Sequence, residues 1–240
     1  MNKPAPTIRV KVDLANPGQF LACCGLLELA DRLWGWAEGW FEGEDFCIAS
    51  QKPLSVLLAA LIQHDAEEVV HLDNGLVVKP LVAPLRIVLD GTSRTSLTLD
   101  AWMTVRSEKG QTRATANPPW NFWSGQQTPR GIWAVLREAL RTQLEELPPD
   151  YERRLFSFLV PLTGRFGFDP GAAWNALDTG FSPNEQKCGV ASSPAVELLA
   201  AIGLQRFRRP SDFAAEWSTA EVTQRWGTLS SKSNDEYRKI

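Results

Sequence analysis

The amino-acid sequence predicts an α+β fold, in which a mostly antiparallel sheet packs against helices and the C-terminal half is rich in helix. Residues 8–13 alternate apolar and charged side chains, which is typical of a half-buried strand. Residues 20–34 repeat apolar side chains every three or four positions, which indicates an amphipathic helix. Strand and helix patterns then continue to intersperse, with hairpins as well as crossovers, and this mixture favours the α+β class.

The N-terminal fifty residues predict the order strand, helix, strand, strand. Asn16 is placed to cap the helix, and Pro17 occupies its first position. The apolar face is expected to consist of Phe20, Cys23, Cys24, Leu27, Ala30 and Trp34. The polar residues Glu28, Asp31 and Arg32 are expected on the outside. A hairpin follows, with its turn at residues 43–45 and with Trp40 and Phe46 in its strands.

The rest of the chain predicts helices at 53–64, 129–147 and 194–204, and strands at 75–81, 85–90, 96–103 and 155–162. The polar segment 105–119 is expected to be mobile, and 148–154 is expected to be a hinge. We therefore divide the chain into three parts. Residues 1–147 form a part that contains the sheet and a basic central segment, residues 148–226 form a turn-rich and helical part packed on it, and residues 227–240 form a tail that frays.

Composition predicts an ordinary folded protein, because 22% of the 240 residues are charged and 44% are apolar. The start of the chain has no apolar region like that of a signal peptide, and no apolar run is long enough to span a membrane. The four cysteines form no CxxC pair, which is typical of reduced thiols. We expect a cytoplasmic protein without a membrane partner.

The basic residues gather in the middle of the chain. Residues 1–75 carry five Lys or Arg against eleven Asp or Glu, a net charge of −6, whereas residues 85–141 carry eight against four, a net charge of +4. A local positive segment is the electrostatic footprint of a phosphate-binding surface. A solvated face with scattered arginines has the same composition, so charge alone does not decide between these interpretations.

The motifs of common hydrolases are missing from the sequence. The chain has neither the GxxxxGK[ST] phosphate-binding loop nor the GxSxG nucleophile elbow. The two histidines, His64 and His71, are expected on a polar surface at a helix end. Three carboxylates in a turn-rich passage, Asp169, Asp178 and Glu185, either serve acid/base or metal chemistry or cap helices. We favour capping, and the sequence predicts no catalytic site, no metal and no cofactor.

The loop at 123–130 has the chemistry of a nucleic-acid contact. Trp123 offers a ring that can stack on unpaired bases, and Gln126 and Gln127 offer hydrogen bonds to base edges, sugars or a backbone. Arg130 can meet a phosphate near a helix N-terminus. The loop fits a structural role equally well, as a buried clasp that holds the following helix to the sheet. Trp133, on the apolar face of that helix, is expected in the core.

Two further basic or polar segments are candidate contacts. Residues 92–96 include Ser93 and Arg94, whose hydroxyl and guanidinium suit a phosphodiester, although a plain hairpin loop uses the same residues. The linker 106–113 carries Arg106, Lys109 and Arg113. These residues complete the predicted nucleic-acid-binding set, which consists of Ser93, Arg94, Arg106, Lys109, Arg113, Trp123, Gln126, Gln127 and Arg130.

Long ungapped stretches of the chain resemble one protein family. They are "NPGQFLACCGLLELADRLWGWAEGWF" at 16–41, "TSLTLDAW" at 95–102, "WSGQQTPRGI" at 123–132, "FGFDPGAAWNALDTGFSPNE" at 166–185 and "PAVELLAAIGLQRFRR" at 194–209. The chain is similar in these stretches to the third member of the Csb group of CRISPR-associated proteins, which occurs in type I-U (also called I-G) systems. Asn121 stands where a basic residue is expected, which argues against a phosphate contact at that position.

The resemblance implies a non-enzymatic, large-subunit-like component or accessory of a Cascade-like CRISPR surveillance complex in antiviral defence. Its partners would be CRISPR RNA, target DNA and the other effector subunits. In such complexes base pairing reads the sequence, while protein subunits hold backbones or melted strands. Two alternatives remain open: a metal-dependent nuclease that uses Asp169, Asp178 and Glu185, and a protein–protein adaptor with exposed tryptophans.

Overall fold

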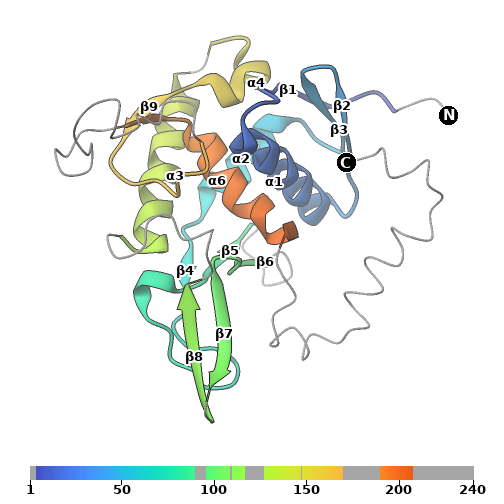
Figure 1. The fold of residues 1–240 in the computed structure, drawn as a ribbon. Coiled ribbons are helices and arrows are strands. Elements are labelled where there is room, and N and C mark those ends of the chain that lie inside the picture. The colour runs from blue at the N-terminus through green and yellow to red at the C-terminus, as the bar shows by residue number, and fades with distance from the viewer. Residues whose placement is uncertain are drawn as a thin grey trace.

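The structure is a computed structural model that describes residues 4–89, 96–108, 110–116, 127–146, 148–169 and 190–207. These residues form an α+β fold, which confirms the predicted class (Figure 1). The described strands form four small antiparallel sheets, with the orders β1-β3-β2, β4-β5-β6, β7-β8 and β10-β9.

The described helices are α1 (Pro17–Trp34), α2 (Leu54–Gln63), α3 (Pro129–Glu145), α4 (Tyr151–Arg154) and α6 (Pro194–Gly203), with the 3-10 helices η1 (Pro80–Val82), η3 (Leu155–Ser157) and η4 (Leu204–Phe207). The strands are β1 (Ile8–Lys11), β2 (Glu38–Glu42), β3 (Asp45–Ala49), β4 (Glu67–Glu68), β5 (Leu85–Val88), β6 (Ser96–Leu99), β7 (Met103–Glu108), β8 (Gln111–Ala116), β9 (Val160–Leu162) and β10 (Val190–Ser192).

The N-terminal unit has the predicted order. β1 and β2 both pair with β3, which therefore lies at the centre of its sheet. The turn between β2 and β3 contains Gly43, whose φ of 61° lies in the left-handed region that glycine adopts without a steric penalty. At the start of α1, the side-chain oxygen of Asn16 accepts hydrogen bonds from the backbone N–H groups of Gly18 and Gln19. The predicted cap is confirmed.

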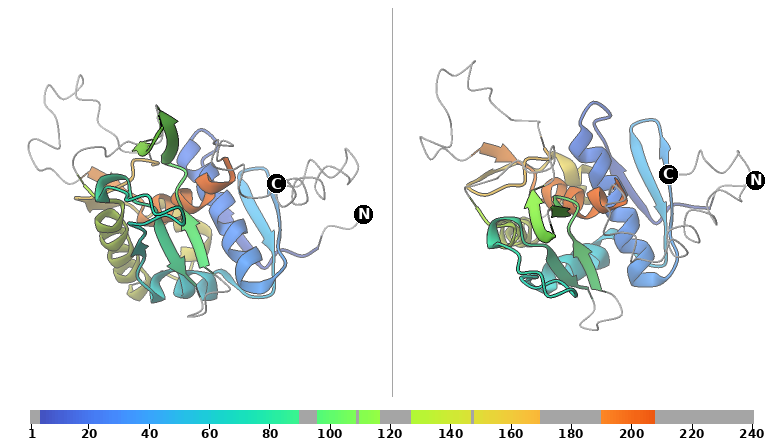
Figure 2. Two further views of the ribbon diagram at one scale, coloured as in Figure 1. Left: turned by 90° about the horizontal axis from the view of Figure 1, so that it is seen from below. Right: turned by 60° about the horizontal axis from the view of Figure 1, so that its bottom comes forward.

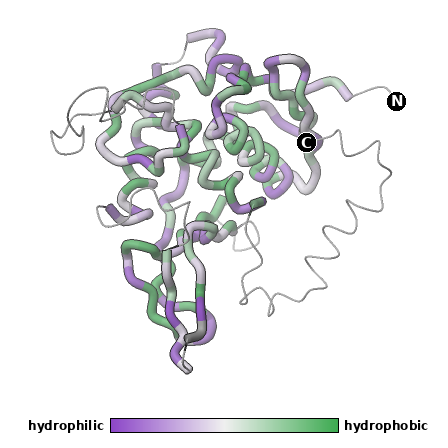
Figure 3. The backbone as a smooth tube through the Cα atoms, in the orientation of Figure 1, coloured by the Kyte–Doolittle hydropathy of each residue, from purple (hydrophilic) through white to green (hydrophobic). Residues whose placement is uncertain are grey.

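Helix α1 lies between the N-terminal sheet and helix α6 (Figures 1 and 2). The two helices approach so closely that a Cβ atom at Gly25 would lie 2.0 Å from the carbonyl oxygen of Leu199. A Cβ at Gly203 would lie 1.9 Å from the carbonyl oxygen of Leu21. Every residue of α6 is buried, and Trp133 of α3 is fully buried beside it, as predicted. Figure 3 shows that the helices at the centre of the molecule are largely hydrophobic.

Several segments differ from their predictions. Residues 75–81 form no strand but a single bridge, between His71 and Val77, followed by η1, because Pro80 has no N–H group for a ladder. The segment 105–119, expected to be mobile, contains most of the β7–β8 hairpin, which turns at Gly110 with a φ of 76°. The predicted hinge at 148–154 contains the short helix α4, and the predicted strand at 155–162 consists of η3 and the shorter strand β9.

Two residues of α1 differ from their predicted exposure. Glu28, expected outside, is 6% exposed and forms ion pairs with Arg32 at 2.5 Å and with Arg206 at 2.6 Å. Phe20, expected on the apolar face, is 40% exposed. The helical period places both residues near the boundary of the face, where η4 contacts them through Arg206 and Phe207.

Candidate nucleic-acid interface

Four of the nine predicted contact residues lie in the described part of the chain, and they fall into two groups. Arg106 and Arg113 lie on the β7–β8 hairpin, and Gln127 and Arg130 lie at the start of α3. The hairpin and α3 both contact η1, so they share a neighbouring segment. The other five predicted residues lie outside the described residues; they are Ser93, Arg94, Lys109, Trp123 and Gln126.

The hairpin brings the two arginines directly opposite each other. In the antiparallel register Arg106 pairs with Arg113, and the next pairs on the same face are Thr104 with Thr115 and Glu108 with Gln111. Directly paired residues of an antiparallel ladder point to the same face, with Cβ atoms about 4.5–5.5 Å apart. Both arginines are exposed, and the hairpin projects from the end of the molecule opposite to α4 (Figure 1). One face of a projecting arm therefore carries two adjacent guanidinium groups.

The two guanidiniums of this pair are like charges on one face of the hairpin. Among the described side chains, Arg113 donates a hydrogen bond of 3.0 Å to the side-chain oxygen of Gln111. Like charges directly opposite each other destabilise a strand pair. An anion placed between the guanidiniums would remove this repulsion, and phosphate is an anion that arginine binds with two parallel hydrogen bonds.

Gln127 has the structural role that the sequence leaves open. Its side-chain amide donates a hydrogen bond of 3.0 Å to the backbone carbonyl of Thr163, 36 residues further along the chain. A Cβ atom at Gly164 would lie 3.3 Å from the side-chain oxygen of Gln127, so the amide packs closely on that backbone. Gln127 thus connects the start of α3 to the segment after β9 by a hydrogen bond.

Arg130 lies in the first turn of α3 and is exposed. The side chain of Thr128 caps this helix by accepting a hydrogen bond from the backbone N–H of Gly131, at 3.1 Å. The first turn has no acidic residue. The positive end of the helix dipole and the guanidinium of Arg130 therefore both favour an anion at this surface.

Asp169, the one described member of the carboxylate set, belongs to a buried polar network. Its side chain is 2% exposed and accepts hydrogen bonds of 2.9 Å from the amide of Asn16 and from the backbone N–H of Ser193, the N-cap of α6. Its own backbone N–H donates to the carboxylate of Glu197 at 2.9 Å. Asp169 therefore binds the backbone at the start of α6, and a helix beginning at Pro170, which the capping hypothesis expects, would lie outside the described residues. Asp178 and Glu185 lie outside the described residues.

Glu197 completes this network from within α6. Its carboxylate also accepts a hydrogen bond of 2.8 Å from the backbone N–H of Gly167. Burial raises the pKa of Glu197, although the hydrogen bonds from Asp169 and Gly167 oppose the shift. The sequence places Glu197 only within an apolar helix, and its role depends on a chain segment that lies thirty residues away.

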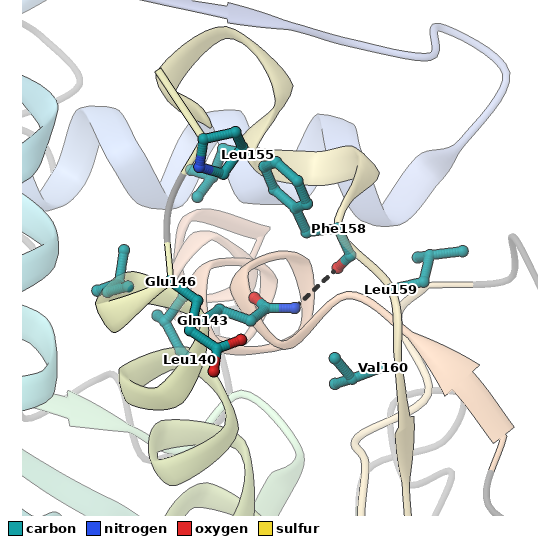
Figure 4. A pocket seen from close by; sticks show the side chains of 9 residues that line it. Leu140, Gln143, Glu146, Leu155, Phe158, Leu159 and Val160 are labelled. Carbon is teal, nitrogen blue, oxygen red and sulfur yellow. Dashed lines mark hydrogen bonds between the residues drawn. The ribbon is translucent and has the colours of Figure 1, made fainter. Parts of the chain in front are cut away.

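A pocket of about 210 Å³ lies between the end of α3 and the segment that leads to β9 (Figure 4). Most of its lining is apolar, and the lining residues include Leu140, Phe158 and Val160. The amide of Gln143 donates to the backbone carbonyl of Phe158 at 3.3 Å, so its donor is already engaged (Figure 4). Glu146 is the charged residue of the lining.

The described residues offer three further features to consider: buried thiols, metal-binding side chains and membrane-spanning helices. The thiols of Cys23, Cys24 and Cys47 are buried, and burial raises the pKa of Cys23 and Cys24. Within the described residues no three His, Cys, Asp or Glu side chains gather in a way that could hold a metal ion. None of the described helices is long and apolar enough to cross a membrane.

The stretches that carry the family resemblance meet in the structure. Asn16 of the first stretch bonds to Asp169 of the fourth. The side-chain oxygen of Gln205, in the last stretch, accepts hydrogen bonds from the backbone N–H groups of Asp100 and Ala101, in the second, at 3.0 and 3.1 Å. These hydrogen bonds therefore connect distant stretches of the chain within the fold.

Comparisons with protein-family models, with curated proteins and with solved structures found no match for this chain.

Proposed function

We propose that this protein is a non-catalytic subunit or accessory of a type I-U CRISPR RNA-guided DNA surveillance complex. In this role the β7–β8 hairpin contacts the phosphate backbone of RNA or DNA. The observation that carries the proposal is the exposed, directly opposed pair of Arg106 and Arg113 on a projecting hairpin. The type of complex is proposed from the family resemblance. The contact with nucleic acid is proposed from the hairpin, whose arginines suit a phosphate backbone.

The arrangement of the arm supports contact with phosphates rather than with base edges. Arginine and threonine side chains on one face can donate to phosphate oxygens, and such contacts position a protein without reading sequence. In an RNA-guided complex the guide reads the sequence, so a subunit that holds backbones is what the chemistry requires. Arg130, at the start of α3, adds a second exposed guanidinium that suits the same ligand.

The nuclease hypothesis draws no support from Asp169. Its carboxylate is buried and accepts hydrogen bonds from Asn16 and Ser193, so it is committed to the packing of α1 and α6. We therefore favour the non-catalytic subunit. Reproducible metal-dependent cleavage of RNA or DNA that is abolished by Asp178→Asn would overturn this choice.

The experiment is a pull-down of the tagged chain from cells that express its genomic neighbours and a CRISPR array. We expect guide RNA and the other effector subunits to co-purify in fixed proportion. Recovery of the chain alone would contradict a stable subunit role. The purified chain is then titrated with RNA and DNA at several salt concentrations.

In these titrations Arg106→Ala/Arg113→Ala should weaken binding to all sequences alike. The slope of log K against log salt should become shallower by about 0.7–0.9 for each phosphate that the variant no longer neutralises. The matched control is Arg153→Ala/Arg154→Ala, which makes the same change in net charge on α4, at the opposite end of the molecule (Figure 1). Equally weakened binding in both double variants would show that the hairpin does not bind the nucleic acid.

A further inference from the structure

The apolar pocket at the end of α3 has room for one side chain of a binding partner. Its volume is about 210 Å³. Sites for drug-sized molecules measure about 300–1,000 Å³, whereas an apolar cavity of about 150 Å³ holds one benzene molecule. The pocket therefore matches a single leucine or phenylalanine side chain better than it matches a cofactor or a larger ligand.

Apolar side chains form most of the pocket, and one of them is exposed. Leu140 and Leu155 are buried, and Phe158 and Val160 are half-buried, whereas Leu159 is 47% exposed. Figure 4 shows Leu159 and Val160 on the side of the pocket opposite to α3. A side chain that enters the pocket would contact Leu159 and remove it from water, which is favourable for an apolar group.

The α3 side of the pocket is negatively charged. Glu146 lines the pocket, Glu145 precedes it in the chain, and both residues are exposed. They lie at the C-terminal end of α3, where the helix dipole is also negative. The last turn of α3 has no basic residue of its own. Carboxylates are unfavourable at this end of a helix, so a cation placed here would stabilise both the glutamates and the helix end.

The arginines of α4, beside the pocket, are paired with carboxylates. Arg154 lies over the ring of Phe158, 5.4 Å from its centroid, and forms an ion pair of 3.5 Å with Asp150. Arg153 forms an ion pair of 3.5 Å with Asp45. These arginines therefore leave the α3 side of the pocket negative, and charge favours a ligand that is apolar at its tip and basic beside it.

We propose that this pocket docks a segment of a partner protein, which inserts one leucine or phenylalanine side chain and places a lysine or arginine at the C-terminal end of α3. The basic side chain acts as a helix cap, because it can donate hydrogen bonds to the last carbonyls of α3 and pair with Glu146. An apolar anchor that fills a pocket inside a polar rim is the usual anatomy of a protein interface.

This docking site is separate from the proposed nucleic-acid contact. Leu155, in the pocket lining, directly follows α4, and α4 lies at the end of the molecule opposite to the β7–β8 hairpin (Figure 1). The proposal therefore goes beyond the proposed function and does not depend on it.

The test measures binding of the full chain to three short synthetic peptides with blocked termini. The first carries a leucine between two arginines, the second has serine in place of the leucine, and the third has glutamine in place of both arginines. We expect saturable binding of the first peptide, with NMR shifts at the backbone amides of Leu144, Glu146 and Leu159. The second peptide should bind more weakly by between about 10-fold and 150-fold, the range for burying one leucine side chain. The third should also bind more weakly, and its binding should not depend on salt.

Two variants of the chain separate the apolar contribution from the charged one. Leu159→Ser should weaken binding of the leucine peptides and leave binding of the serine peptide unchanged. Glu145→Gln/Glu146→Gln should weaken binding of both arginine peptides by between about twofold and 30-fold, the combined range of two exposed ion pairs. The matched control is Glu44→Gln/Glu67→Gln, which makes the same change in net charge at exposed positions outside the pocket. Thermal unfolding establishes that each variant is folded.

Four outcomes overturn the docking site: no saturable binding of the first peptide, equal binding of the leucine and serine peptides, equal binding of the arginine and glutamine peptides, or an equal loss in the control variant. The oligonucleotide titrations of the hairpin variants do not depend on any of these outcomes. The docking site and the proposed function can therefore fail separately.

Discussion

The side-chain amide of Asn16 donates a hydrogen bond of 2.9 Å to the carboxylate of Asp169, 153 residues further along the chain. The oxygen of the same amide caps α1, and the second carboxylate oxygen of Asp169 accepts the backbone N–H of Ser193 at the start of α6. One pair of buried side chains thus joins the first turns of two helices that also pack against each other through glycines. Changes to this pair should affect stability without touching any exposed contact residue.

Asn16→Asp tests this connection, because aspartate caps helices as well as asparagine does. The variant keeps the cap but replaces the donor to Asp169 with a second carboxylate. We expect it to lower the free energy of unfolding by more than the about 1–3 kcal/mol that an unsatisfied buried group costs. Asn16→Ser, which adds no charge, should cost less. The difference between the variants, measured by urea unfolding, should shrink at acidic pH, where a protonated aspartate can donate again. A difference that is constant with pH would contradict direct contact with Asp169.

Glu197 predicts a pH dependence of stability. Because burial raises its pKa in the folded state, it binds its proton more tightly there than in the unfolded chain, whose pKa is near 4.5. The stabilisation present below that value is therefore lost as pH rises through the folded-state pKa. Relative to Glu197→Gln, the wild type should lose stability over the pH range just above 4.5. Denaturant unfolding at a series of pH values measures this, with Glu145→Gln as an exposed control, and parallel curves for wild type and Glu197→Gln would refute it.

The local elements of this fold are well predicted from the sequence, because local elements depend on neighbouring residues. The alternation at 8–13 and the cap at Asn16 each lie within a few residues of the structure that they produce. The error at 75–81 has the same local origin, since the apolar content suggests a strand and the prolines prevent the pairing. The hairpin at 103–116 escapes prediction because its polar composition is also that of a mobile segment, whereas its β-branched residues and Gly110 favour a ladder and a turn.

The candidate site can be predicted only as a list of residues. Charge points to Arg106 and Arg113, but their direct opposition depends on the register of the hairpin, which composition does not contain. Gln127 suits two roles by its chemistry, and only the carbonyl of Thr163 distinguishes them. Outside this site, Phe20 and Phe207 are 187 positions apart in the sequence and meet only because α6 crosses α1. Contacts of this range are set by the tertiary fold.

Gly25 and Gly203 should be the least replaceable glycines of the helix pair. A Cβ atom at either position would lie about 2 Å from a backbone carbonyl oxygen of the other helix, which does not move aside as a side chain can. We expect Gly25→Ala and Gly203→Ala each to destabilise the protein by at least the about 1–3 kcal/mol typical of overpacking. Gly131→Ala in α3, whose Cβ would meet only the hydroxyl of Thr128 at 3.2 Å, is the control and should change stability by less than about 1 kcal/mol. Similar midpoints of denaturant unfolding for all three variants would contradict the close approach of α1 and α6.

The ion pairs of Glu28 predict a non-additive double variant. Arg32→Ala and Arg206→Ala each leave the buried carboxylate with one guanidinium, so each should have a modest cost. The double variant removes both of these guanidiniums at once, and removing charged partners from a buried carboxylate is strongly destabilising. We expect the decrease in unfolding free energy of the double variant to exceed the sum of the single decreases by about 0.5–3 kcal/mol, the range of coupled neighbours. Additive decreases would mean that other groups already neutralise Glu28.

Arg106→Glu should move stability and nucleic-acid binding in opposite directions. The new carboxylate lies directly opposite Arg113, so a cross-strand repulsion becomes an attraction, and we expect the hairpin to gain about 0.2–1 kcal/mol. The same change removes a phosphate-binding group and adds a negative charge beside the remaining guanidinium. Binding to RNA and DNA should therefore fall further than it does in Arg106→Ala. The measurements are thermal unfolding and a titration at one fixed salt concentration, with Arg153→Glu on α4 as the charge-matched control. A variant that is more stable and binds as the wild type does would show that the arginines are opposed for some reason other than a phosphate.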